Sequence, residues 1–284
     1  MTESYHQSSL ETYRSCPQRY VYSRIRREPP SFKSAAAHAG NTAHAVLAHL
    51  HETGEVLDYV NTWNRLENEP DRVWGIKLPV YIEDGKPGLP EYLAKFNAWF
   101  TPFLKHPASQ PTDIIGIELP FEFEWTTKRA KSPYRFKGTM DLVYREVTDT
   151  STRLVIRDYK TGNSIDSDAT FMRKIQAPLY AWGLSSILRH LAGIDIAFEI
   201  FSTADLVPYQ KKTTRKVPRP NAAWWRWSQE RLDPLAFSAG EHRGPGVYRY
   251  TLTPEYLRYW RRIILSIAAS IRRREFYPSP NMYG

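Results

Sequence analysis

The sequence predicts an α/β fold in which a mixed central β-sheet is flanked by helices. Residues 113–125 alternate apolar and polar side chains, as a strand with one buried face does. Residues 135–145 and 153–160 are rich in Phe, Tyr, Val and Leu and are separated by a polar cluster, which predicts a β-hairpin. Residues 34–53 and 253–275 have the spacing of helices that cover a sheet.

Composition indicates a folded domain with a basic surface. The chain has 284 residues, 42% of them hydrophobic, which excludes a disordered chain. Lys and Arg number 39 against 30 Asp and Glu, and a net charge of +9 suits a polyanion such as nucleic acid. With Cys16 as its one cysteine and no signal peptide or apolar run of about 20 residues, we expect a cytoplasmic protein without a membrane span.

The N-terminal part is predicted to be helical. Residues 8–28 read as a helix with a basic side, interrupted at Pro17. Its arginines either contact phosphates or are simply solvated. Residues 34–53 form a second helix that ends at Gly54.

Within that second helix, Gly40 costs about 1 kcal/mol relative to alanine, which suggests close packing against another element. His44 and His51 lie on one side of the helix. A helical histidine is more often a structural residue than a ligand. Residues 55–110 are predicted to hold short helices near 56–66 and 90–104, as an insertion beside the sheet.

Polar side chains gather where the predicted hairpin ends. Residues two apart on a strand share a face, so Asp158 and Lys160 point the same way, and Asp141 brings a second carboxylate from the partner strand. Charges that lose water are costly, and a divalent ion would compensate the carboxylates. Oxygen ligands suit Mg²⁺ or Mn²⁺. The alternatives are that Asp158 and Lys160 form a solvated strand end and that Glu118 stays on a polar face rather than supporting a metal.

The remaining segments carry weaker signals. Gln176 and Tyr180 share a face of a helical pattern that starts at Phe171, and they are either packing or site residues. Pro178 is expected to kink this helix or to start a helical turn. A strand is predicted at 194–203 and an edge strand at 247–252. The basic run 211–219 is a solvated loop or a backbone contact to nucleic acid, and the tryptophan cluster 224–227 is core or a base-stacking surface, with core favoured.

Five motifs occur in an order typical of one family. They are the segment 9–20 (SLETYRSCPQRY), Gly40-x-x-x-His44, Gly138-x-x-Asp141, Asp158-x-Lys160 and Gln176-x-x-x-Tyr180. Over residues 8–185 the chain resembles RecB-type nucleases of the PD-(D/E)xK superfamily, including CRISPR-associated and phage RecB-like exonucleases.

The resemblance implies a restriction-endonuclease-like core and an organisation in three parts. Residues 1–112 would be an N-terminal helical region that contributes the histidine of the active site. Residues 113–205 would be the catalytic core, and residues 206–284 a basic loop and C-terminal helix packed on it.

The resemblance also implies the roles of the site residues. Mg²⁺ or Mn²⁺ would be held by His44, Asp141, Asp158 and the carbonyl of Tyr159. Lys160 would position or help deprotonate the attacking water, and Gln176 and Tyr180 would orient the metal ligands or the DNA backbone. Many RecB-type nucleases hold an iron–sulfur cluster on four cysteines. Only Cys16 matches that set, so no iron–sulfur cluster is expected.

The implied function is a Mg²⁺- or Mn²⁺-dependent deoxyribonuclease, an exonuclease in the first instance. Its substrate would be single-stranded DNA or duplex ends, in DNA repair, recombination, or phage or CRISPR-related DNA processing, with a helicase or recombination protein as a partner. The alternatives are a non-catalytic nucleic-acid-binding scaffold and a site-specific endonuclease. The complete set of Asp141, Asp158 and Lys160 argues against the scaffold.

Overall fold

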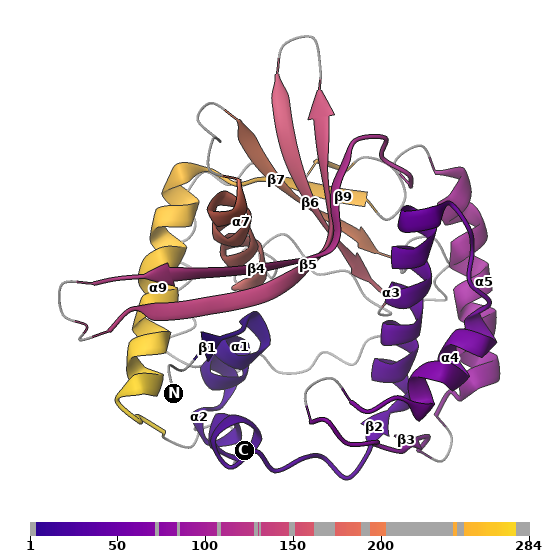
Figure 1. The fold of residues 1–284 in the computed structure, drawn as a ribbon, viewed down its shortest axis with the longest axis horizontal. Coiled ribbons are helices and arrows are strands. Elements are labelled where there is room, and N and C mark those ends of the chain that lie inside the picture. The colour runs from indigo at the N-terminus through magenta and orange to yellow at the C-terminus, as the bar shows by residue number, and fades with distance from the viewer. Residues whose placement is uncertain are drawn as a thin grey trace, which may run out of the picture.

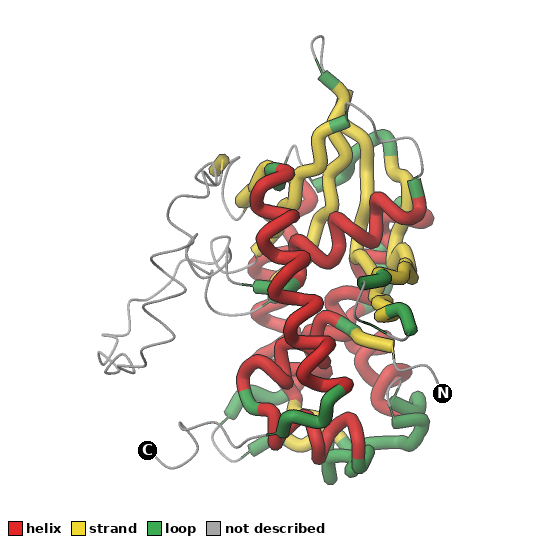
Figure 2. Tube along the Cα trace, turned by 90° about the vertical axis from the view of Figure 1, so that its left-hand side faces the viewer, coloured by secondary structure: helices red, strands yellow, loops and turns green. Residues whose placement is uncertain are grey.

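The computed structural model contains one mixed β-sheet between two layers of helices (Figure 1). It describes residues 4–71, 74–83, 86–106, 109–127, 130, 132–147, 151–161, 174–188, 194–202, 241–242 and 247–276. The predicted fold class is confirmed. In the view turned by 90° the strands gather in the upper part of the molecule, and helices extend below them (Figure 2).

The sheet has seven strands, ordered β1-β5-β6-β7-β9-β8, with β4 paired to β5. Pairs β4–β5, β5–β6 and β7–β9 are antiparallel, whereas β6–β7 and β1–β5 are parallel. The strands are β1 (Ser4–Tyr5), β4 (Ile114–Trp125), β5 (Tyr134–Val147), β6 (Thr152–Lys160), β7 (Asp195–Ser202), β8 (Glu241–His242) and β9 (Val247–Thr251). The predicted hairpin is confirmed as β5–β6.

Helices cover both faces of the sheet. On one face lie α3 (Ala35–Thr53), α4 (Tyr59–Asn68) and α5 (Leu89–Lys105), and on the other α1 (Gln7–Ser15), α7 (Gln176–Ile187) and α9 (Pro254–Arg272). The short elements α2 (Pro17–Tyr20), η1 (Val21–Ile25), β2 (Lys33–Ser34) and β3 (Val80–Tyr81) complete the described chain. Alternation along β6 sends Ile156 to the α7 side and Val155 to the α3 side, so the strand is buried on both faces.

The β4–β5 ribbon turns sharply at Glu118 and Asp141 (Figure 1). Met140 packs with the α7 layer and Leu142 with the α3 layer, although residues two apart on a regular strand share a face. On β4, Glu118 has φ +45°, in the left-handed region that non-glycine residues seldom adopt. The turn brings both carboxylates to one corner.

Helix α3 has the ends that the sequence predicts. The Ser34 hydroxyl accepts a hydrogen bond from the backbone N–H of Ala37, and Gly54 ends the helix with φ +78°. A Cβ added at Gly40 would lie 3.4 Å from Oγ1 of Thr161, so α3 passes in contact with the residue that follows β6. That distance is an ordinary van der Waals contact, which leaves room for a Cβ, and the close approach brings His44 to the end of β6.

The N-terminal helical segment is interrupted at Pro17, as predicted. Residues 8–28 form the separate elements α1, α2 and η1, because Cys16 is extended (φ −159°, ψ 104°) and Pro17 begins a new turn. Cys16 is buried, and its sulfur accepts the backbone N–H of Arg19. Tyr13 and Tyr20 pack on Phe276, which ties this region to the end of α9.

Two other boundaries change. In the part of the chain that the structure describes, the helix expected from Phe171 begins at Gln176, and Pro178 lies in its first turn, consistent with the expected start of a helical turn. The strand β9 is not the last of the sheet, because β8 pairs with its outer edge. No helix among the described residues is long and apolar enough to cross a membrane.

Some predicted features lie outside the described residues. They are the basic run 211–219, the tryptophan cluster 224–227 and most of the basic turn at 128–131. The boundaries at 112 and 205 stay predictions.

Candidate active site

The end of β6 carries an ion pair on the side that faces α7. Nζ of Lys160 lies 2.5 Å from Oδ2 of Asp158, whose side chain is 4% exposed. The alternation of β6 directs both side chains past the buried Ile156, so the predicted shared face is present.

Helix α7 contributes Gln176 to the site. Nε2 of Gln176 donates to Oδ1 of Asp158 at 2.5 Å, and Nζ of Lys160 donates to Oε1 of Gln176 at 3.2 Å. The amide thus orients the carboxylate and the ammonium together. Tyr180, one turn later and 8% exposed, packs on Phe121. Burial, and then the charge of Asp158, raises the pKa of the Tyr180 phenol, which keeps it protonated.

Asp141 lies at the corner of the β4–β5 ribbon, beside the main chain of β6. Its Oδ2 accepts the backbone N–H of Tyr159 at 2.9 Å. On the α3 side, Nδ1 of His44 lies 3.5 Å from the same oxygen, and Nε2 of His44 lies 3.1 Å from the carbonyl oxygen of Tyr159. His44, Asp141 and the Tyr159 carbonyl, three of the four predicted metal-binding groups, therefore lie next to one another. Asp158, the fourth, directly precedes Tyr159 on β6.

The sequence left the role of Glu118 open, and the structure places it in this cluster. One ligand atom each from His44, Glu118 and Asp141 lies within 4.8 Å of the others. The left-handed backbone of Glu118 is what directs it there, and a strand with regular alternation gives no sign of it.

The residues present fit a divalent metal ion. Oδ2 of Asp158 lies 2.5 Å from Nζ of Lys160, so the ammonium balances the charge of this buried carboxylate. The second carboxylate, the partly buried Asp141, lies with Glu118 and His44, and a divalent ion beside them would compensate its charge. Carboxylates, a carbonyl and one imidazole together suit Mg²⁺ or Mn²⁺.

The cluster opens into a pocket of about 460 Å³. His44, Glu118 and Asp141 line one part of it, and Asn41 of α3 lies one turn before His44. Across the pocket, Lys33 pairs with Asp71 at 3.3 Å. The opening gives a phosphate a route to the carboxylates.

Behind the site, buried polar groups hold β6 in place. Nε2 of His51 lies 2.6 Å from the hydroxyl of Tyr159. Arg157, 1% exposed, donates to Glu199 on β7 at 2.6 Å, and Glu199 also accepts from Arg249 on β9. These pairs connect three neighbouring strands and fix the strand that carries Asp158.

The metal-free carboxylates repel one another. Burial, and then the charge of Asp158, raises the pKa of Asp141 to about 7, while His44 opposes the shift. The fold therefore keeps a proton on Asp141 that an arriving cation must displace.

Metal affinity is accordingly expected to fall below about pH 7. Because one proton is displaced, the dissociation constant for Mn²⁺ should rise about tenfold for each pH unit below that value and level off above about pH 8. Calorimetry at about pH 6, 7 and 8 measures this dissociation constant. The Asp141→Asn variant should bind Mn²⁺ weakly, and its dissociation constant should no longer change with pH in this way. An affinity that does not change over this range would contradict the assignment.

The sequence profile of the PD-(D/E)XK nuclease superfamily matches residues 6–283. Among solved structures, the chain aligns with one titled "Putative exonuclease" from Eubacterium rectale, with a TM-score of 0.48 and 9% identity over 96% of this chain and 83% of that one. It also aligns with the structure of SSO0001 (TM-score 0.31, 13% identity, 71% of this chain), of which it covers 65%, less than two thirds. No curated protein shows a significant match to the chain.

Proposed function

Because this chain belongs to the PD-(D/E)XK nuclease superfamily, whose members are metal-dependent hydrolases of nucleic acid, we propose that it hydrolyses DNA phosphodiesters with Mg²⁺ or Mn²⁺. The observation that carries the proposal is that Asp141, Asp158 and Lys160 meet at the end of β6. Gln176 is hydrogen-bonded to Asp158 and Lys160, and His44 lies beside Asp141 and is hydrogen-bonded to the Tyr159 carbonyl.

In this proposal the ion is held by Asp141, Asp158, the Tyr159 carbonyl and His44, with Glu118 as an additional carboxylate. When bound, it supplies a water of lowered pKa and stabilises charge on the phosphate. The hydrogen bond between His44 and the Tyr159 carbonyl holds these two groups close together in the free protein.

Lys160 acts on the attacking water or the scissile phosphate. Its ammonium is 36% exposed, so a substrate can reach it, and Gln176 and Asp158 fix its position. Gln176 holds the pair, and Tyr180 stays a neutral hydrogen-bonding phenol beside them. Both are positioning residues.

The finer assignment is an exonuclease that acts on single strands or duplex ends in DNA repair, recombination, or phage or CRISPR-related processing, together with a helicase or recombination partner. The test is to incubate labelled linear and circular DNA, single- and double-stranded, with Mg²⁺, Mn²⁺ or EDTA. Cleavage of linear forms alone, abolished by EDTA, supports an exonuclease. Cutting of circles at one sequence identifies a site-specific endonuclease, and binding without cleavage under every condition identifies a scaffold.

Replacement of His44 should weaken metal binding strongly, although its side chain is partly exposed. His44→Ala removes an imidazole ligand and the contact that holds the Tyr159 carbonyl, so we expect Mn²⁺ affinity to fall at least ~10-fold, as for disturbed metal shells. Calorimetry compares it with His49→Ala, a histidine on the same helix that is not among the cluster's residues. Equal affinity in the two variants would make His44 a structural residue.

A further inference from the structure

One edge of β5 has a short unpaired stretch between the part that pairs with β1 and the part that pairs with β6. Strand β1 pairs with β5 as far as Phe136, and β6 pairs with it from Leu142 onward. In the described part of the chain, residues 137–141 between them pair with no strand on that edge, and Asp141 is the last of the five. These residues form a path along β5 that ends at the candidate metal cluster.

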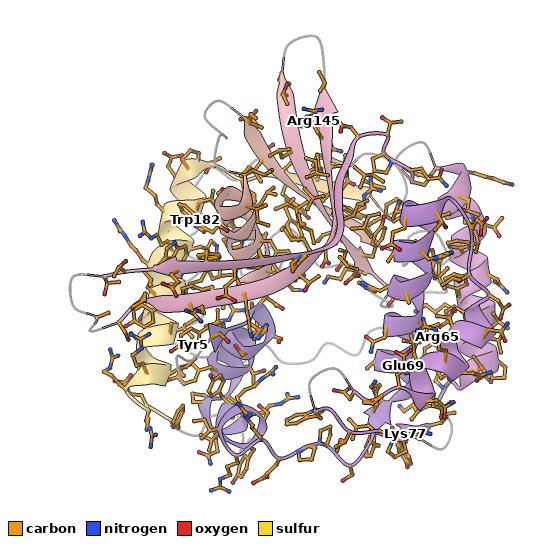
Figure 3. The ribbon with its side chains drawn as sticks, in the orientation of Figure 1. Tyr5, Arg65, Glu69, Lys77, Arg145 and Trp182 are labelled. Atoms are coloured by element: carbon orange, nitrogen blue, oxygen red, sulfur yellow. The ribbon has the colours of Figure 1, made fainter. Side chains whose placement is uncertain are left out.

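A second pocket, of about 650 Å³, lies at the other end of this path. Lys137, Gly138 and Thr139 of β5 line it, opposite the first residues of the chain after β1, His6–Ser8. Its volume is that of a small-molecule site, roughly 300–1,000 Å³, so it accommodates one flexible strand and not a duplex. Figure 3 labels Tyr5, which lies beneath the ribbon next to these residues in the sequence.

The charges in the second pocket favour an anion. Lys137 forms no ion pair with a carboxylate in the described part of the chain. Glu122 lies across from it and shares Arg135 with Glu124, so these three side chains carry one net negative charge, which Lys137 and Arg24 together outweigh. Arg24 donates to the Ser8 hydroxyl at the rim of the pocket.

The pKa of His6 also indicates positive charge around this pocket. Burial, and then the charges of Lys137 and Arg24, lowers the pKa of this histidine, so two cations lie close enough to act on it. Its neutral ring offers a hydrogen bond without further charge.

Tyr180 places the second pocket next to the carboxylates of the site. Tyr180 lines the second pocket, and the charges of Asp158 and Asp141 act on its phenol. Lys137 lies four residues from Asp141 along β5, about 14 Å at the rise of a strand. A stacked strand advances 3.4 Å per nucleotide, so this span corresponds to about four nucleotides, and to fewer when the strand is extended.

We propose that the pocket around Lys137 is a nucleotide subsite that binds a phosphate of a single strand two to four nucleotides from the scissile bond. Lys137 is the phosphate ligand, and Arg24 positions Ser8 at the rim. The inference rests on the proposed function, since it names where the rest of that substrate lies.

The first test measures binding without cleavage. Anisotropy of a labelled 12-nucleotide single-stranded DNA is recorded in Ca²⁺ over a salt series. Each lost phosphate contact reduces the slope of log K against log salt by ~0.7, the reduction expected for Lys137→Ala. Lys77→Ala, an exposed lysine bonded to Asn68 and labelled far from Tyr5 in Figure 3, should keep the wild-type slope. Equal slopes for the two variants would overturn the subsite.

The second test locates the contact. Single neutral methylphosphonates are moved along the strand, and the Mn²⁺-dependent cleavage rate at a fixed bond is read. In wild type, substitution two to four nucleotides away should slow cleavage, and in Lys137→Ala that position should cease to matter. Dependence only on the scissile phosphate would overturn the proposal. If wild type cleaves nothing, the nuclease proposal fails, while the binding slopes still decide the subsite.

Discussion

We expect Asp158→Asn to abolish cleavage of DNA and to leave the fold intact. Asparagine keeps the shape of a buried side chain and a carbonyl oxygen for Gln176, but it removes the charge that would bind a cation. A metal ion contributes several kcal/mol to transition-state stabilisation, and about 4 kcal/mol corresponds to about 10³-fold in rate. We therefore expect at least that loss in single-turnover cleavage of linear DNA with Mn²⁺, and a similar loss for Asp141→Asn.

Two comparisons separate this effect from misfolding or general loss of charge. Asp113→Asn removes a carboxylate from the exposed pair with Arg145, at the far end of the β5–β6 hairpin, and should cleave as wild type does. Thermal unfolding of the metal-free proteins should be cooperative in all variants. A well-folded Asp158→Asn protein with full activity would exclude the proposed site.

Local patterns predicted the part of the site that depends on strand alternation. Asp158 and Lys160 are two apart on one strand, so their shared face follows from backbone geometry alone. The hairpin that places Asp141 beside them follows from two apolar runs and a polar turn. The roles of His44, Gln176 and Tyr180 depended on family resemblance, because distance in sequence conceals that α3 and α7 meet the end of β6 from opposite sides.

Other features arise from tertiary structure. The turn at Glu118 breaks the alternation on which its assignment to a polar face depended, and no local signal marks a left-handed residue there. Arg157 and Glu199 are buried and pair across β6 and β7 in the core, which no local pattern predicted. Helix α1 packs in the same core cluster as α9, whereas the sequence grouped it with the other N-terminal helices.

Lys160→Ala should separate catalysis from substrate binding. Loss of one cation among many phosphate contacts changes DNA affinity little, whereas loss of a group that acts on the attacking water lowers turnover by ~10²–10⁴-fold. The lysine is held by Asp158 and Gln176 at the end of β6, so its position is set before substrate arrives. Affinity is measured in Ca²⁺, and single-turnover rate in Mg²⁺ or Mn²⁺.

Lys160→Arg and Lys77→Ala complete the comparison. Arginine keeps the positive charge but not the compact ammonium that fits between Asp158 and Gln176, so we expect affinity to be retained and the rate to stay low. Lys77→Ala should match wild type in both measurements, since Lys77 bonds to Asn68 on the surface. If affinity and rate fell together by the same modest factor in Lys160→Ala, and arginine restored both, Lys160 would be a phosphate anchor and not a participant in the chemical step.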